Sequence, residues 1–249
     1  MSATRGRLLA TGNVAEVFEY GNHVVKLYKS VTAKPTVFRE AAIHAAVADL
    51  GLPVPAVWGV LQLECRWGIV FDRVNQASFA KWILENPNDR LGCLERMAQL
   101  HLQIHAHSAI QLGSLKLRLA ANIADTIVFD LPRKHRLFVG LAEMPEGDKL
   151  CHGDFHPLNI LGDASQPIVI DWPDARRGHP TADVCRSYLL LKLHADELAT
   201  PYLEAYCRIS GVHSESILRW LPYVAAAKVA EQVPSELDRL LDIVRLNDE

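Results

Sequence analysis

Hydrophobic and polar positions follow two different patterns along the chain. Up to about residue 75, short segments rich in valine, phenylalanine and tyrosine alternate with turn residues, and Gly21 with Asn22 favours a hairpin between two of them. The stretch from Thr36 to Leu50 instead has apolar residues at helical spacing. These patterns predict a five-stranded sheet with one inserted helix. The predicted strands are Arg7–Ala10, Val14–Tyr20, His23–Tyr28, Val57–Leu63 and Trp67–Phe71.

After Val74 helical spacing prevails, which predicts a larger and mainly helical part. Its predicted helices are Leu91–His107, Leu115–Val128, Pro132–Ala142, Thr181–His194, Leu198–Ser210, Ser214–Val229 and Pro234–Leu246. Short strands are expected between them at Lys149–Cys151, Ile160–Leu161 and Pro167–Ile170. The change of pattern predicts two domains, an N-terminal one of residues 1–74 and a C-terminal one of residues 75–249.

Composition and charge exclude several classes of protein. The 249 residues are 49% apolar and 22% charged, which is typical of a globular chain and not of a disordered or fibrous one. No apolar run reaches the roughly 18 residues that a membrane-spanning helix needs. A net charge of −3 without runs of like charge predicts neither a nucleic acid nor a membrane partner.

Cysteine usage and the N-terminus bear on the compartment. Five widely spaced cysteines without a CxxC pair disfavour both a disulfide framework and a cysteine zinc site. The first five residues lead into a predicted strand and lack an apolar signal core. We therefore expect a cytoplasmic protein.

Reactive side chains concentrate in one segment between apolar strands. His152, Asp154 and Asn159 lie on a segment that Gly153 and a proline keep irregular, and Asp171 follows the β-branched run of the next predicted strand. Two carboxylates and an amide presented this way can hold a divalent cation, and a carboxylate free of the metal can accept a proton from a hydroxyl. Turn capping would explain a single aspartate, but the whole set favours a functional site.

Two metal-site alternatives start from histidines. His152, Asp154 and His156 at alternate positions could form a metal hydrolase site, but that interpretation leaves Lys26 and Asn159 unexplained. A second pair of histidines, at helical i, i+4 spacing, is flanked by leucine and isoleucine, which favours packing over metal binding. This pair is His101 and His105.

The motif pair resembles that of a known enzyme family. His152-Gly153-Asp154 with Asn159, followed by Ile170-Asp171-Trp172, is similar to the catalytic and metal-binding motifs of the aminoglycoside phosphotransferase and choline kinase family. Further segments stand in that family's order; they are the Lys26 strand, the Leu52–Pro55 connector, Leu100-His101 and the Asp183 segment. The last 40 or so residues match no motif. The resemblance implies an α+β, two-lobed protein-kinase-like fold.

The same resemblance implies roles for individual residues. Asp154 corresponds to the catalytic aspartate that accepts or orients the proton of the substrate hydroxyl. Asn159 and Asp171 correspond to the ligands of Mg²⁺. Lys26 corresponds to the strand lysine that contacts the phosphates of ATP, and Glu40 to the helix glutamate that pairs with it.

Two further segments are implied to bind the nucleotide, and one residue to brace the catalytic loop. Thr11, Gly12 and Asn13 stand where the nucleotide loop is expected but lack a Gly-x-Gly-x-x-Gly pattern. The hinge beside adenine corresponds to the segment from Phe71 through Arg73 to Val74. Asp183 corresponds to an aspartate that braces the catalytic loop by hydrogen bonds.

These implications predict an enzyme that transfers the γ-phosphate of ATP to a hydroxyl of a small molecule, without a protein partner. Residues 75–249 carry 18 basic and 23 acidic side chains, which favours a cationic acceptor such as an aminoglycoside, choline or another amino alcohol. The acidic residues that favour a cationic acceptor are Asp174, Asp196, Glu197 and Glu204.

Two alternative functions stay open on the sequence. A nucleotide-binding pseudokinase or regulatory scaffold would fit the poor glycine loop. Against it, Lys26, Asp154, Asn159 and Asp171 are all present. A protein kinase would need a longer activation segment than the 11 residues between Asp171 and Asp183.

Overall fold

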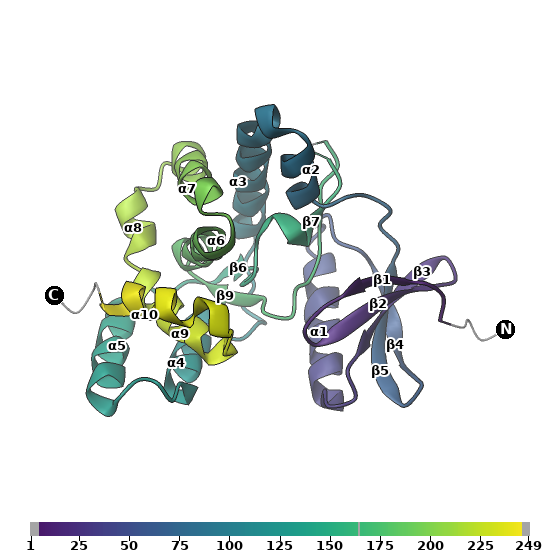
Figure 1. The fold of residues 1–249 in the computed structure, drawn as a ribbon, viewed down its shortest axis with the longest axis horizontal. Helices are drawn as coiled ribbons and strands as arrows, with labels where there is room; N and C mark the ends of the chain where they lie inside the picture. The colour runs from purple at the N-terminus through teal and green to yellow at the C-terminus, as the bar shows by residue number, and fades with distance from the viewer. Residues whose placement is uncertain (1–4, 164, 246–249) are drawn as a thin grey trace. The chain divides into compact units, whose positions relative to one another are not determined.

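The computed structural model describes residues 5–163 and 165–245 (Figure 1). The chain divides into two compact units. The first comprises Met1–Trp82 and Leu158–Pro173, and the second comprises Ile83–Pro157 and Asp174–Glu249. A short segment of the second half of the sequence therefore belongs with the N-terminal sheet.

The first unit is built on an antiparallel sheet. Over the described residues its strands are β1 (Leu8–Thr11), β2 (Ala15–Tyr20), β3 (His23–Tyr28), β4 (Val57–Leu63) and β5 (Arg66–Asp72), in the order β1-β2-β3-β5-β4. Helix α1 (Lys34–Ala48) follows β3. Gly21 takes φ of 60° in the β2–β3 turn, as the hairpin requires. The predicted five-stranded antiparallel sheet with one helix is confirmed.

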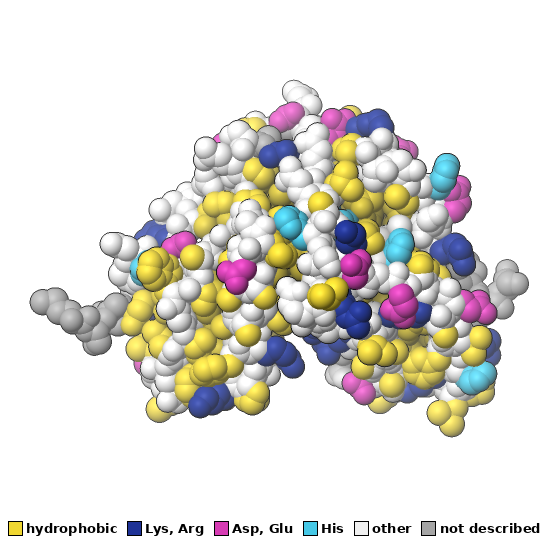
Figure 2. Space-filling model, turned by 180° about the vertical axis from the view of Figure 1, so that it is seen from behind, with side chains coloured by type: hydrophobic (Ala, Val, Ile, Leu, Met, Phe, Trp, Pro, Cys, Tyr) yellow, Lys and Arg dark blue, Asp and Glu magenta, His cyan; other side chains and the backbone are white. Residues whose placement is uncertain are grey.

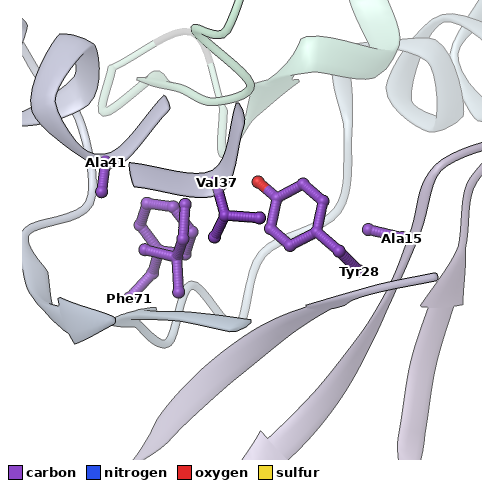
Figure 3. Close-up of a cluster of buried hydrophobic side chains, with 6 residues drawn as sticks. Ala15, Tyr28, Val37, Ala41 and Phe71 are labelled. Atoms are coloured by element: carbon purple, nitrogen blue, oxygen red, sulfur yellow. The ribbon is translucent and has the colours of Figure 1, made fainter. Parts of the chain in front are cut away.

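Helix α1 covers one face of this sheet. Alternation along β3 directs Tyr28 toward the helix, where it lies in one buried cluster with Val37 and Ala41 of α1 and with Ala15 and Phe71 of the sheet (Figure 3). The other face has its own cluster of buried residues, which consists of Phe18, Val25, Leu27 and Val70. Position 26 shares its face with Tyr28, so its side chain lies on the α1 side of the sheet.

The segment 158–173 is joined to the first unit by main-chain hydrogen bonds. Its strands β7 (Ile160–Leu161) and β8 (Ile168–Val169) form a small antiparallel ladder. The Val169 amide donates to the Pro53 carbonyl at 2.8 Å, and the Gly162 amide donates to the Ala77 carbonyl at the same distance. The proline-rich connector before β4 thereby fixes the start of this ladder.

The second unit is mainly helical, as predicted. Its larger helices, over the described residues, are α3 (Arg90–Ala106), α4 (Leu115–Asp125), α5 (Leu131–Glu143), α6 (Pro180–His194), α7 (Asp196–Ser210), α9 (Leu221–Lys228) and α10 (Leu237–Arg245). Shorter elements are α8 (Ser214–Leu218) and the 3₁₀ turns η1 (Pro87–Asp89), η3 (Val229–Glu231) and η4 (Pro234–Glu236); a further turn, η2 (Pro157–Asn159), spans the boundary to the 158–173 segment. Strand β6 (Lys149–Cys151) pairs with β9 (Arg176–Gly178).

Several predicted elements differ from the structure. The prediction of a single helix over Ser214–Val229 is wrong, because Pro222 lacks an amide hydrogen and stands in the first turn of a new helix, α9. The predicted Leu115–Val128 helix ends at Asp125, where the Thr126 hydroxyl donates to the Ile123 carbonyl. Two elements were not predicted, namely α2 (Phe79–Glu85) and β9.

The last predicted helix begins as the turn η4 and continues as α10. Its predicted end at Leu246 lies outside the described residues, as do residues 1–4 at the N-terminus of the chain. Across the part that the structure describes, no helix has both the length and the apolar character to cross a bilayer. On the face shown in Figure 2, basic and acidic side chains are interspersed with hydrophobic ones.

Candidate active site

Lys26 of β3 lies between two carboxylates in the first unit. Its Nζ donates to Glu40 Oε1 at 2.8 Å and to Asp171 Oδ1 at 2.6 Å. We call these three residues the Lys26 group. Burial by itself lowers the pKa of Lys26, but the charges of Asp171 and Glu40 outweigh it and raise that pKa above its ordinary value. The ammonium is therefore charged at any working pH.

Glu40 is buried although its neighbour Arg39 is exposed. Helical periodicity explains this, because Glu40 follows Val37 by three residues and both face the sheet. The structure thus brings together three predicted site residues that are separated in sequence, Lys26, Glu40 and Asp171.

Asp171 and Asn159 are brought together by the β7–β8 ladder. The Ile170 amide donates to the Asn159 carbonyl at 3.0 Å, so these two residues extend the ladder beside Asp171. Asp171 has φ of 65°, a left-handed conformation that costs free energy in residues other than glycine but is tolerated best by asparagine and aspartate. Such a backbone is typical of a functional position.

A cavity of about 360 Å³ adjoins the Lys26 group. Its walls are mostly apolar and come from the sheet and the 158–173 segment. Lining residues outside the Lys26 group include Leu9, Ala10, Val17, Val24, Phe71, Leu161 and Ile170. The strand register explains this wall, since Val17 pairs with Lys26 and Val24 pairs with Phe71. A mainly apolar cavity that also has charged groups in its lining suits a base and its phosphates.

The predicted nucleotide-binding residues divide into two sets. Phe71 lines the cavity, whereas Thr11, Gly12, Asn13 and Arg73 are not among its lining residues. The Arg73 guanidinium instead contacts Glu19 and Asn75, at 3.0 and 2.6 Å. The apolar residues that line this cavity were not predicted. They could have been found by listing the residues that pair with Lys26 and its neighbours on the adjacent strands.

Asp154 lies in the second unit between two basic side chains. Its carboxylate is 3.3 Å from His156 Nε2 and 3.6 Å from Arg186 Nη2. We call these three residues the Asp154 group. Burial by itself raises the pKa of Asp154, but the hydrogen bond from His156 and the charge of Arg186 hold it well below its ordinary value. Asp154 is therefore ionised at neutral pH.

The loop before Asp154 is held by a buried carboxylate. The amides of His152 and Gly153 donate to Asp183 at 2.6 and 2.8 Å. Asp183 lies in the first turn of α6 and is fully buried. Gly153 has φ of 84°, and a side chain there would come within 2.6 Å of the Asp174 carbonyl oxygen. Glycine is thus required at this position by both backbone conformation and space.

A second cavity, of about 200 Å³, adjoins the Asp154 group. Its charged lining is mixed in sign and comes from α4, α6, α9, η3 and the turn before β9; it includes Arg118, Asp174, Arg186, Lys228 and Glu231. The Glu231 carboxylate pairs with two of these cations, Arg186 at 2.6 Å and Lys228 at 2.7 Å. Sequence reasoning noted Asp174 but missed the others, because no spacing in the sequence links these segments.

The fold has solved relatives. A ternary complex of a thermostable mutant of aminoglycoside phosphotransferase APH(4)-Ia with ADP and hygromycin B is 16% identical, covers 96% of this chain and 89% of that one, and superposes with a TM-score of 0.69. An aminoglycoside-3'-phosphotransferase of type VIII is 22% identical, with coverages of 91% and 94% and a TM-score of 0.64. A choline/ethanolamine kinase family protein from Mesorhizobium loti is 15% identical, with coverages of 97% and 93% and a TM-score of 0.63.

Sequence comparison assigns the family independently of these structures. Comparison with curated protein sequences gives no match. The family model described as a phosphotransferase enzyme family matches residues 16–218, which include Lys26, Asp154 and Asp171. The kinase-like fold and the family match agree, and the chain belongs to the phosphotransferase enzyme family, as a small-molecule kinase.

Proposed function

We propose that this enzyme transfers the γ-phosphate of ATP to a hydroxyl of a small molecule. The observation that carries the proposal is Lys26, held by both Glu40 and Asp171 at the edge of an apolar cavity of about 360 Å³. A half-buried lysine fixed in this way can bind phosphate oxygens with a preset position. The ADP in the ternary complex of aminoglycoside phosphotransferase APH(4)-Ia supports a nucleotide in this fold.

In this proposal residues 1–74 form the nucleotide-binding lobe, with the catalytic residues and the acceptor site within 75–249. The adenine occupies the apolar cavity, Lys26 binds the α- and β-phosphates, and Glu40 keeps the ammonium in place. Backbone groups of the turn Thr11–Asn13 and of the hinge Phe71–Arg73 contribute to nucleotide binding. The side chain of Arg73 does not, since it is already paired.

Asn159 and Asp171 are the proposed ligands of Mg²⁺. The donor set fits this ion, because an amide oxygen and a carboxylate on adjacent ladder residues are the hard oxygen ligands that Mg²⁺ prefers. When bound there, Mg²⁺ supplies neutralisation of phosphate charge. Asp171 also holds Lys26, so one carboxylate orders both positive charges.

Asp154 is the proposed group that receives the proton of the acceptor hydroxyl. Its ionised carboxylate can accept a hydrogen bond from that hydroxyl and orient it. The Asp183 bonds to His152 and Gly153 support this role, because they fix the loop that carries Asp154. General-base assistance of this kind contributes about 10²- to 10⁴-fold to the rate.

The cavity beside Asp154 is the proposed acceptor site. Its exposed Asp174 favours a cationic acceptor, such as an aminoglycoside, choline or another amino alcohol. The exposed Arg118 in the same lining favours a second class, hydroxylated acceptors that also carry a carboxylate. Its volume of about 200 Å³ lies below the usual range for drug-sized ligands, about 300–1,000 Å³, which favours a compact acceptor.

The test is Mg²⁺-dependent release of ADP with a panel of amino alcohols, aminoglycosides, sugars and hydroxy amino acids. The Asp154→Asn variant should lower kcat about 10²- to 10⁴-fold while the Kd for ATP stays within a few-fold. Asp242→Asn is the matched control, because Asp242 is exposed on α10, where it pairs with the neighbouring Arg245.

Three outcomes decide the proposal. Acceptor-dependent ADP release that Asp154→Asn abolishes supports it and identifies the acceptor class. ATP binding without any acceptor response favours the pseudokinase alternative. Full turnover in Asp154→Asn would remove Asp154 from its proposed role.

A further inference from the structure

A buried network lies behind the loop that carries Asp154. We call it the Asp183 network; its members are Asp183, His101 and His105 of α3, and Tyr202 and Tyr206 of α7. All five side chains are buried, with exposures between 0% and 4%. Together with the amides of His152 and Gly153, the two imidazoles surround the carboxylate of Asp183 with four donors.

The protons of this network can be assigned from its chemistry. An ionised carboxylate has no hydrogen to donate, so His101 Nε2 at 2.9 Å and His105 Nε2 at 3.2 Å must donate to Asp183. Burial by itself raises the pKa of Asp183, but the interactions with His101 and, next, with His105 outweigh it and hold that pKa well below its ordinary value. Burial, with the neighbouring His105, lowers the pKa of His101 to about 3, so His101 is neutral.

The remaining ring nitrogens face tyrosines. His101 Nδ1 is 2.7 Å from the Tyr202 hydroxyl, and His105 Nδ1 is 2.9 Å from the Tyr206 hydroxyl. Burial raises the pKa of both phenols, so both keep their protons. Neutral His101 donates from Nε2 and therefore accepts at Nδ1, so Tyr202 donates to His101. His105 has the same contacts, with Nε2 on Asp183 and Nδ1 facing the Tyr206 hydroxyl, so we assign it the same hydrogen bonds.

A metal ion is the competing occupant, since the ligand atoms of His101, His105 and Asp183 lie within 4.8 Å of one another. The hydrogen bonds argue against it on chemical grounds. An ion at both Nε2 atoms would displace the two protons that bind Asp183, and Asp183 Oδ2 already accepts the His152 amide at 2.6 Å. No ring nitrogen of the pair is left without a protein partner.

On the basis of the proposed function, we propose that Tyr202 and Tyr206 are positioning residues for the transfer step. Their hydroxyls hold the two imidazoles in the Nε2–H tautomer, which keeps both donors on Asp183. Asp183 in turn holds the loop before Asp154. Helix α7 thereby sets the position of the proposed catalytic carboxylate without touching the substrate.

The experiment uses Tyr202→Phe, Tyr206→Phe and the double variant of the full chain, because phenylalanine keeps the buried ring and removes only the hydroxyl. Tyr188→Phe is the matched control, since Tyr188 is a half-buried tyrosine of α6 outside the network. Protein labelled with ¹⁵N-histidine reports the tautomers through the ring nitrogen shifts. Amide hydrogen exchange at His152 and Gly153 reports the loop and needs no substrate.

We expect Nε2–H signals for both histidines in the wild type and a shifted His101 signal in Tyr202→Phe. Amide exchange at His152 and Gly153 should become at least about threefold faster in that variant, and kcat should fall about three- to tenfold at an unchanged Kd for ATP, the size expected for one lost hydrogen bond. The Tyr206→Phe variant should shift the His105 signal and should change the amide exchange and kcat by similar amounts.

Two results would overturn the inference. One is an unchanged histidine spectrum or unchanged amide exchange in the double variant; the other is a stoichiometric bound metal in the purified wild type. If no acceptor is phosphorylated by the wild type, the proposed function fails, whereas the spectra and the exchange rates still decide the network.

Discussion

The two charged groups of this enzyme have opposite arrangements of charge. In the Lys26 group one cation lies between two carboxylates, whereas in the Asp154 group one carboxylate lies between a histidine and an arginine. The first arrangement has an excess of negative charge, which suits the arrival of a divalent cation with the nucleotide. The second keeps a carboxylate ionised in a partly buried position.

The difference separates binding from chemistry. A lysine whose pKa is raised is a fixed cation and serves to hold phosphate. A carboxylate whose pKa is lowered is always available to a hydroxyl, yet it takes up a proton weakly. Orientation of the hydroxyl is then a larger part of its role than early proton removal, which agrees with a transition state that is mostly dissociative.

The first prediction removes the cation of the Lys26 group. Lys26→Met leaves Glu40 and Asp171 facing each other without a counter-ion, so we expect the Kd for ATP to rise about 10- to 100-fold, the loss of a charge-assisted contact of about 1.5–3 kcal/mol. Isothermal titration measures it. Lys29→Met, an exposed lysine on the same segment, is the control. Equal affinity in wild type and Lys26→Met would separate this group from the nucleotide.

The second prediction concerns the metal. Asp171→Asn should reduce the gain in ATP affinity on adding Mg²⁺ to less than about a third of the wild-type gain, because the amide offers the ion no charge. ATP binding titrated with and without Mg²⁺ measures this. Asp49→Asn, at the exposed end of α1, should retain the full gain. A full Mg²⁺ effect in Asp171→Asn would contradict the metal assignment.

The third prediction uses the pH profile. A lowered pKa means that Asp154 stays ionised as the pH falls, so it should give no acid limb in kcat/KM above about pH 5. Arg186→Met removes a cation that lowers the pKa of Asp154, so burial raises the pKa of Asp154 relative to the wild type. The acid limb of the kcat/KM profile should therefore move to higher pH. Arg208→Met, in an exposed ion pair with Glu95, should leave the profile unchanged. An unshifted profile in Arg186→Met would show that Arg186 does not act on Asp154.

The smallest expected effect belongs to Arg73. Its guanidinium is paired with Glu19 and Asn75 and does not line the nucleotide cavity. Arg73→Gln should therefore change the KM for ATP less than about twofold, in line with the small energy of exposed ion pairs. A tenfold change in steady-state KM would place Arg73 in nucleotide binding after all.

Local sequence patterns were sufficient for the strands β1 to β5 and for helix α1 of the first unit. Alternation along β3 gave the strand and its lysine, and the helical spacing of Val37, Glu40 and Ala41 defines the buried face of α1. The predicted hairpin between β2 and β3 is present, whereas the pairing of β3 with β5 rather than with β4 required the structure. Glu40 follows Val37 by three residues, so the same helical spacing places it on the buried face of α1.

The second unit depends on contacts between distant segments. The Asp154 group needs Arg186 from α6, and Arg186 is in turn held by Glu231, 45 residues further along. The Asp183 network joins α3 to α7 over 101 residues. Nothing in the local pattern of Tyr202 or Tyr206 distinguishes a hydrogen-bond donor from a packed ring, so this part of the site required the structure.

Binding of Mg²⁺-ATP to Lys26→Met and Asp154→Asn, measured side by side with the wild type, tests most directly the claim that one group binds and the other acts. The account predicts that the Kd rises about 10- to 100-fold in Lys26→Met and stays within a few-fold of wild type in Asp154→Asn. Loss of binding in Asp154→Asn, or wild-type affinity in Lys26→Met, would contradict it.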